Sequence, residues 1–254
     1  MSVEAALQLE GRYPDRVMST PAGPTLDPAY TDEFGPFRTA RTLAKLTTFA
    51  FIAFMAGTLW QLALSFEALS IGRDPARLTL EWASDFDARL QQAAIGSLIF
   101  YLVNAVFFSM WTYRVAKNAH GFRGAEMSIS PGWAVGYYYV PIVSLWRPYQ
   151  AIKEIWVASI MPGESRRVPP WWLPVWWIAW VGTFFINRVL MRSSEPASIE
   201  EWVDLHGALV ASNAAQLLSA VMALAVVWQL TRLQERHALP SAKALGPASP
   251  ASDG

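Results

Sequence analysis

Four long apolar runs constrain this chain more than any other feature of its sequence. They cover about residues 43–66, 93–113, 171–191 and 208–230. Each is close to the roughly 20 residues that an α-helix needs to cross the ~30 Å hydrocarbon layer of a membrane. A segment in lipid must pair all its own backbone polar groups, which a helix does within itself. We therefore predict an all-α integral membrane protein with four transmembrane helices.

The composition supports a membrane protein and excludes several other classes. Hydrophobic residues make up 53% of the chain and charged residues only 16%, away from the average of soluble domains. Lys plus Arg, at 20, equal Asp plus Glu, at 20, so the net charge gives no reason to expect a nucleic-acid partner. The chain has no Cys, which excludes disulfides, thiolate catalysis and Cys-ligated metals.

The charges between the apolar runs alternate in sign along the chain. Lys and Arg crowd the flank before the first run, the connection of residues 114–170 and the flank after the fourth run. Acidic residues dominate the other two connections. By the positive-inside rule both termini and the central connection are cytoplasmic. The prediction is a multi-pass membrane protein with the N- and C-termini in the cytoplasm.

Three polar segments complete the predicted organisation. Residues 1–37, with five prolines from Pro14 to Pro36, and residues 237–254 are expected to be disordered tails. The membrane domain is then residues 38–236. Residues 67–92 form a polar connection, part of which is expected to fold onto the membrane surface through four apolar side chains. These are Leu78, Leu80, Trp82 and Phe86.

The segment of residues 130–161 is apolar and aromatic but is not expected to cross the membrane. As a helix, residues 131–145 reach only about 22 Å, and Pro141 would kink or end that helix. A fifth span would also move the later basic flanks to the outside. We predict a re-entrant or interfacial element between the second and third spans, with Ser130 as helix cap and Pro131 at the first helical position. A second, amphipathic helix is expected to start at Pro148.

Several motifs in and around this element resemble one known family. They are Trp111-x-Tyr113-Arg114 with Asn118, the run SPGWAVG from Ser130, Val140-Pro141-Ile142, the run LWRPY from Leu145, Glu154-x-Trp156 and Thr231-Arg232-Leu233-Gln234. Together they resemble the bacterial membrane-protein family catalogued as domain of unknown function 4328, over roughly residues 93–236. The chain departs from the family pattern at residues 137–139 and at Ser144. The resemblance implies a multi-span inner-membrane protein and no known activity.

The central connection supplies the candidate binding residues for lipid or a partner protein. Arg147, between Trp146 and Pro148, is the foremost: its guanidinium either binds a lipid phosphate bidentately or anchors the loop. Arg114 and Lys117 are candidates of the same kind, or simple flank charges. The full set is Arg114, Lys117, Ser130, Pro131, Gly132, Trp133, Pro141, Trp146, Arg147, Pro148, Glu154 and Trp156.

Polar and small residues inside the predicted spans are a second group of candidates. Asn104, Asn213 and Gln216 either bond to a neighbouring helix or line a permeation path. Along the fourth span a small residue recurs every four positions, which allows close packing within the bundle or between copies of the chain. This small-residue ridge consists of Gly207, Ala211, Ala215, Ser219 and Ala223.

The sequence shows no catalytic or metal-binding motif. His120, His206 and His237 lie in three separate regions without an HExxH-like pair, and His120 is expected at the surface past a helix end. We therefore predict no catalytic residue, no metal and no cofactor. The leading hypothesis is a non-enzymatic scaffold, assembly factor or sensor that acts through a basic, aromatic cytoplasmic platform. The alternatives are a small transporter or channel and, third, a haem- or lipid-modifying enzyme.

Overall fold

The structure, a computed structural model, describes residues 36–122, 127–160, 168–190 and 196–244. Within these ranges the chain is helical and contains no β-strand, which confirms the predicted all-α class. The elements are α3 (Arg41–Arg73), η1 (Pro75–Arg77), α4 (Leu80–His120), α5 (Pro131–Gly136), η2 (Val143–Leu145), α6 (Arg147–Ala158), α7 (Trp172–Leu190) and α8 (Ile199–Ala244).

Four of these helices, α3, α4, α7 and α8, are long and apolar enough to cross a membrane. Three of them extend well beyond the apolar runs. α3 has 33 residues and α4 has 41, about 50 and 60 Å at 1.5 Å per residue, against a hydrocarbon layer of ~30 Å. α8 continues to Ala244, eight residues into the segment assigned to the C-terminal tail. Residues 1–35 and 245–254 of the predicted tails lie outside the described residues.

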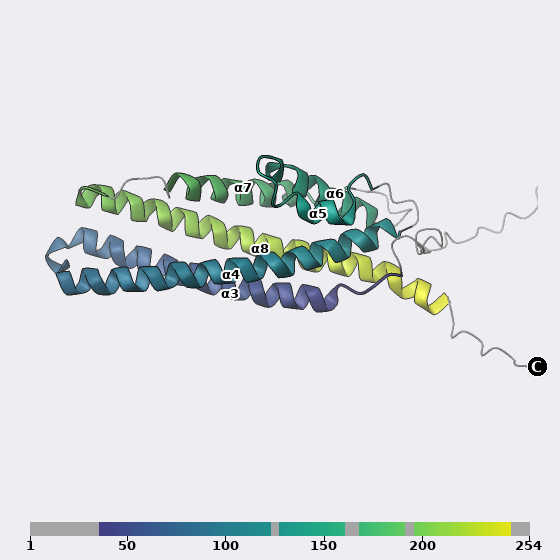
Figure 1. Cartoon of the computed structure of the whole chain (residues 1–254), viewed down its shortest axis with the longest axis horizontal. Helices are drawn as coiled ribbons and strands as arrows, with labels where there is room; N and C mark the ends of the chain where they lie inside the picture. The colour runs from purple at the N-terminus through teal and green to yellow at the C-terminus, as the bar shows by residue number, and fades with distance from the viewer. Residues whose placement is uncertain (1–35, 123–126, 161–167, 191–195, 245–254) are drawn as a thin grey trace, which may run out of the picture.

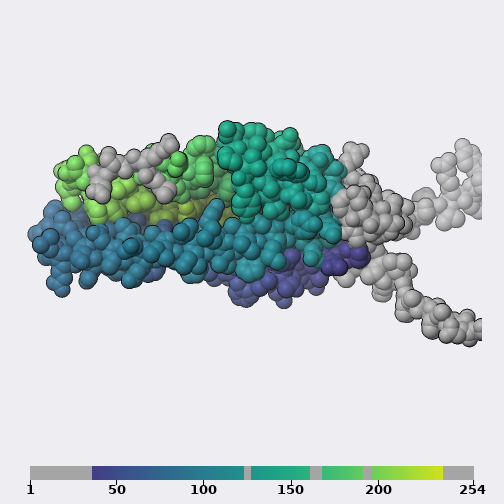
Figure 2. All heavy atoms as spheres, viewed as in Figure 1, coloured from purple at the N-terminus to yellow at the C-terminus, as the bar shows by residue number. Residues whose placement is uncertain are grey.

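The long helices lie alongside one another in alternating directions (Figure 1). α3 packs against both α4 and α8, and α7 packs against α8. The start of α3, the ends of α4 and α8, the start of α7 and both short helices lie at one end, which we call the basic end. The α3–α4 connection and the α7–α8 connection lie at the other, the acidic end. Figure 2 shows a hollow between α4 and α7, with α8 at its floor.

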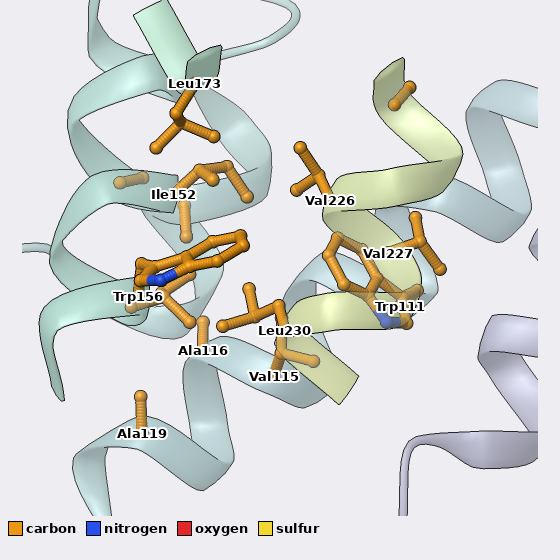
Figure 3. Close-up of a cluster of buried hydrophobic side chains, with 14 of the residues drawn as sticks. Trp111, Val115, Ala116, Ala119, Ile152, Trp156, Leu173, Val226, Val227 and Leu230 are labelled. Atoms are coloured by element: carbon orange, nitrogen blue, oxygen red, sulfur yellow. The ribbon is translucent and has the colours of Figure 1, made fainter. Parts of the chain in front are cut away.

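The main core lies toward the basic end, where the four long helices meet α5 and α6. Trp111 of α4, Ile152 of α6, Leu173 of α7 and Val226 of α8 belong to one cluster of buried side chains (Figure 3). Trp111, Ile152 and Leu173 are fully buried there. Burial of a large apolar side chain contributes about 1.5–3 kcal/mol, so this cluster fixes α6 against the long helices.

The short helices form a helical hairpin, residues 131–158, that leaves from and returns to the basic end (Figure 1). Ser130 caps α5, since its side chain accepts a hydrogen bond from Trp133 N, and Pro131 occupies the first turn, both as predicted. α5 ends at Gly136, and the chain reverses around Pro141 and Ile142. α6 then runs from Arg147 to Ala158, close to the predicted second helix.

The reversal contains a strained γ-turn. Ile142 has φ 67° and ψ −56°, and Val143 N donates to Pro141 O across 2.7 Å. This conformation is rare, and for a β-branched residue it is costly, about 1–3 kcal/mol. The predicted interruption at Pro141 is therefore present, one residue before the sharpest bend.

Small residues allow close helix packing at two places. A Cβ added to Gly57 of α3 would lie 3.0 Å from Ser97 Oγ of α4, so the two helices approach closely there. In the small-residue ridge of α8, Ser219 and Ala223 are buried inside the bundle, whereas Gly207 and Ala211 are exposed. The part of the ridge nearer the basic end thus packs within this chain.

The acidic end has a small core of its own. Phe86 of α4 is buried beside Leu64 and Ala68 of α3, stacks on Trp82 at 4.8 Å and contacts Trp202 of α8 at 5.8 Å. The predicted fold of this region onto the membrane surface is therefore not what the structure shows for Trp82 and Phe86, which pack against other helices. Leu78 and Leu80 remain exposed, Leu80 at 92%.

Candidate functional site

The two ends of the bundle carry opposite charge. Among the described residues from 36 to 236, nine cations and two carboxylates lie at the basic end, and four cations and eight carboxylates lie at the acidic end. The basic end has Arg38, Arg41, Lys45, Arg114, Lys117, Arg147, Lys153, Arg232 and Arg236 against Glu154 and Glu235. The acidic end has Glu67, Asp74, Glu81, Asp85, Asp87, Glu200, Glu201 and Asp204 against Arg73, Arg77, Arg89 and Arg188. The charge alternation of the sequence is thus a separation in space.

The outer surface of the hairpin joins aromatic rings to a cation. Trp133 stacks on Tyr137 at 5.1 Å between ring centroids, and Arg147 Cζ lies 5.7 Å from the centre of the Tyr137 ring. Arg147 Nη1 also donates to Gln150 Oε1 across 3.2 Å. Arg147 and Trp146 are both exposed. These contacts orient the guanidinium and leave most of its donors available for an anion.

The other predicted residues of the central connection divide into surface and packing positions. Ser130, Gly132, Trp133 and Pro141 are exposed. Pro131, Pro148 and Trp156 are buried, so they support the hairpin from inside and are not available to a partner. Arg114 and Lys117 are half-buried in the last turns of α4, where a cation interacts favourably with the helix dipole.

Glu154 closes the base of the hairpin. Its Oε1 accepts from Ser128 Oγ across 2.6 Å, and its Oε2 accepts from Ser128 N across 3.0 Å and Ile129 N across 3.2 Å. Three bonds to one carboxylate join the residues before α5 to α6. Glu154 therefore has a positioning role in this structure.

Two aromatic side chains of α7 hold the hairpin tip. Trp177 Nε1 donates to Leu145 O across 2.7 Å. The Tyr138 ring meets the rings of Trp177 and Trp180 edge-on, with centroids 6.1 and 6.4 Å away, and meets Phe108 of α4 at 5.7 Å. The hairpin is thereby wedged between α4 and α7.

A buried network of amides lies below the hairpin and was not predicted. Gln234 Nε2 of α8 donates to Val115 O and to Ser159 Oγ, across 2.9 and 3.0 Å. Asn118 Nδ2 donates to Gln234 Oε1 across 3.2 Å and to Arg38 O across 2.9 Å. The network ties the start of α3 to α4, α6 and α8. The signal was present, because Asn118 and Gln234 are both in the motifs quoted above.

A family model described as "Domain of unknown function (DUF4328)" matches residues 74–232, more than half of the chain. The chain belongs to this family. The match confirms the resemblance and includes α4, the hairpin, α7 and most of α8. No curated protein and no solved structure matches the chain. The DUF4328 assignment therefore brings no activity.

In this DUF4328 chain the intramembrane candidates are not joined by hydrogen bonds. Asn104 is half-buried on α4, and its Oδ1 is buried without a partner among the described residues. Asn213 is buried and Gln216 half-buried on α8. Within the described ranges no hydrogen bond connects the three. A polar contact between α7 and α8 comes instead from Ser212 Oγ, which donates to Asn187 Oδ1 across 2.9 Å.

The histidines of the DUF4328 chain lie apart. His120 is buried in the last turn of α4 with Nδ1 2.9 Å from Ala116 O, so the expected surface position was wrong. His206 is buried at the acidic end against Trp202. The side chain of His237 lies outside the described residues. Among the described residues no group of three or more His, Asp or Glu is placed to hold a metal ion.

Proposed function

We propose that this DUF4328 protein is a non-enzymatic protein of a bacterial inner membrane that works as a scaffold, assembly factor or sensor. Its working surface is the basic, aromatic platform of the central connection, roughly residues 114–170, on the cytoplasmic side. The observation that carries the proposal is the separation of charge between the two ends. Counted over the described residues from 36 to 236, nine cations against two carboxylates gather where both ends of the membrane domain and the hairpin meet.

The orientation follows from this separation. Loops rich in Lys and Arg stay on the cytoplasmic side of a bacterial inner membrane, and four helices of alternating direction bring all three basic segments to one end. We infer that the basic end, both termini and the hairpin face the cytoplasm. The acidic end then faces the periplasm.

Two features of the hairpin support a re-entrant position in the inner leaflet. Its tip exposes Ile142 at 71%, in a strained turn, together with Tyr139 and Trp146. Exposed apolar side chains are unfavourable in water and favourable in lipid. The Tyr139 hydroxyl also lies 2.7 Å from Ser109 Oγ, only four residues before Tyr113, where the second apolar run ends. A tip at that level lies among the outer acyl carbons.

The ligand class of the platform is the phosphate of an anionic phospholipid. Arg147 begins α6 directly after exposed Trp146, at the edge of the tip, and its long side chain can extend from there toward the headgroup level. Tyr137 and Gln150 fix its guanidinium in place. A planar guanidinium binds phosphate through two parallel hydrogen bonds. A basic surface at the membrane also attracts anionic lipids at long range.

Lipid binding tests the platform. Full-length protein and the variant Arg147→Ala, each in micelles with phosphatidylglycerol, are compared by native mass spectrometry for retained lipid. The matched control is Arg188→Ala, an exposed Arg at the acidic end. We expect Arg147→Ala to retain several-fold less lipid and Arg188→Ala to match the wild type. Equal retention by all three proteins would reject the lipid platform.

Cysteine labelling tests the orientation, because the chain has no native Cys. Single cysteines replace Lys153 on the hairpin and Asp74 at the acidic end, both exposed. In intact cells a membrane-impermeant maleimide should label Asp74→Cys and not Lys153→Cys until the membrane is opened. Positions 125 and 165, outside the described residues, should behave like 153. Labelling of these positions from outside would reverse the proposed arrangement.

A small transporter or channel is the second candidate, and one observation favours it. Asn104 Oδ1, near the middle of α4, is buried and has no partner in the part of the chain that the structure describes, and polar groups inside membranes are often functional. This role predicts that Asn104→Leu abolishes solute flux in liposomes with the protein still folded. Flux that is absent from the wild type, or unchanged in Asn104→Leu, removes this candidate.

A further inference from the structure

Four buried polar atoms from four different elements have no hydrogen-bond partner among the described residues. They are Asn104 Oδ1 of α4, the Tyr138 hydroxyl of the hairpin, Trp176 Nε1 of α7 and Ser219 Oγ of α8. A buried polar group without a partner costs about 1–3 kcal/mol. In native proteins such groups are commonly met by ordered water.

Two side-chain hydrogen bonds give the relative depth of the helices. Trp111 Nε1 donates to Thr231 Oγ1 across 2.9 Å, so position 111 of α4 is level with position 231 of α8. Ser212 Oγ donates to Asn187 Oδ1, so position 212 of α8 is level with position 187 of α7. α4 runs in the same direction as α8, and α7 runs in the opposite direction.

Counting from these bonds brings three of the four atoms to similar depth. Asn104 is seven residues before Trp111 and so is level with position 224 of α8, seven before Thr231. Trp176 is eleven residues before 187 on the antiparallel α7 and so is level with position 223, eleven after 212. Ser219 lies about one turn further toward the acidic end, about 6–8 Å along the axis.

Tyr138 lies among the same side chains. Its ring contacts Phe108, which is one turn after Asn104 on the same face of α4. It also contacts Trp177, the neighbour of Trp176, and Trp180, which is level with position 219 by the count above. The hairpin therefore brings the Tyr138 ring to the depth of the other three groups. A fifth atom without a partner in the described ranges, Thr112 Oγ1, lies two turns from Asn104 toward the basic end and is not included.

The chemistry of the four groups defines the guest. None is charged: the Asn104 oxygen only accepts, Trp176 Nε1 only donates, and the two hydroxyls do either. Burial raises the pKa of the Tyr138 phenol above its usual range, so this hydroxyl keeps its proton. A molecule that meets all four must be small, uncharged and able both to donate and to accept, because an ion would remain unpaired in a low-dielectric interior.

We propose that Asn104, Tyr138, Trp176 and Ser219 line an internal site beneath the hairpin tip that holds small uncharged hydrogen-bonding molecules, with water as the resident guest. The site is independent of the lipid platform, since it lies inside the bundle and uses none of the basic residues. The hairpin closes it by placing Tyr138 over the other three groups. The interior of this membrane domain is hydrated at one defined place.

Thiol reactivity measures local water, because the thiolate reacts and the thiol does not, and a thiolate forms only where it is solvated. Ser219→Cys replaces one atom in a chain free of Cys. Its matched control is Ala220→Cys. Ala220 has nearly the same depth and is 3% exposed, against 4% for Ser219, but its side chain points about 100° away from that of Ser219 around the helix axis. Both are treated in liposomes with methyl methanethiosulfonate, which is small and uncharged, and the adduct is followed by mass spectrometry.

We expect Ser219→Cys to react at least about tenfold faster than Ala220→Cys. Leu218→Cys, exposed toward lipid, should be slow, which separates hydration from mere exposure. Lys153→Cys should be fast and shows that the reagent is active. If Ala220→Cys fails to elute like the wild type, Ala44→Cys, fully buried on α3, replaces it. Equal rates for Ser219→Cys and the dry control, both fast or both slow, would overturn the proposal.

Discussion

The side-chain amide of Gln234 donates to the backbone oxygen of Val115 across 2.9 Å, joining positions 119 apart in the chain. The same amide group meets Asn118 and Ser159, and so one side chain of α8 connects the end of α4 to the end of α6. The network is buried, with Gln234 at 1% exposure. It fixes how the basic end is assembled, which makes it the first place to test the fold.

Replacing Gln234 by Leu keeps the size of the side chain and removes every polar contact. We expect a loss of about 1–3 kcal/mol in the free energy of unfolding, because Val115 O and the Asn118 amide lose a partner in a buried place. Unfolding in mixed micelles titrated with SDS measures it. Gln229→Leu, at an exposed position of the same helix, should change stability by less than about 0.5 kcal/mol. Similar losses in both variants would contradict the network.

Trp177→Phe tests how the hairpin tip is held. The change keeps a ring against Tyr138 and removes the donor to Leu145 O, so we expect faster hydrogen exchange of the backbone amides in residues 137–146. Trp180→Phe is the matched control, since the Trp180 ring also packs on Tyr138 but makes no hydrogen bond within the described residues. Faster exchange in the control alone would show that ring packing holds the tip.

Glu154→Gln tests the closure of the hairpin base. A neutral amide has one acceptor oxygen in place of two, so at least one of the three bonds to Ser128 and Ile129 is lost. The expected cost is about 1 kcal/mol, below the roughly 1.5–3 kcal/mol typical of hydrogen bonds to charged groups, because Ser128 is exposed. Thermal unfolding in detergent measures it against Lys153→Gln, a neighbouring change at an exposed site that should leave the midpoint unaltered.

Gly57→Val tests the close approach of α3 and α4. The new Cβ would lie 3.0 Å from Ser97 Oγ and 3.3 Å from Phe100 Cδ2, and the two methyl groups would add to the conflict. We expect destabilisation of about 1–3 kcal/mol from overpacking. In Gly96→Val of α4 the Cβ meets nothing within 4 Å, so SDS titration should show a much smaller change. A Gly57→Val protein as stable as Gly96→Val would mean that the helices are further apart.

The features that the sequence predicts well are those that depend on local pattern. The four apolar helices, the cap at Ser130 and the helix after Pro148 each follow from a run or a motif of a few residues. The opposite charges of the basic end and the acidic end follow from the alternating charge sign of the connections, once the helices are known to alternate in direction. Family membership was also recognisable from motifs.

The features that it misses depend on contacts between distant residues. Glu67 and Arg89 suggested a polar loop, yet Arg89 binds Glu67 through two nitrogens, at 2.8 and 2.7 Å, from one helix to the next. The pairing allows α3 and α4 to remain helical through charged sequence. Likewise, the sequence around Asn118 does not indicate that its side chain is bonded to Gln234, which lies 116 positions later in the chain. No local pattern contains that information.

The length of α8 has a mechanical consequence. Its 46 residues run from the acidic end to the basic end, and Trp202 near its start belongs to the small outer core while Gln234 belongs to the amide network. A straight rod fixed at both ends transmits displacement. Movement of the outer core by something bound to it would shift the floor on which the hairpin rests, on the opposite side of the lipid. Through α8, a displacement at the acidic end would thus be felt at the basic end, and the reverse.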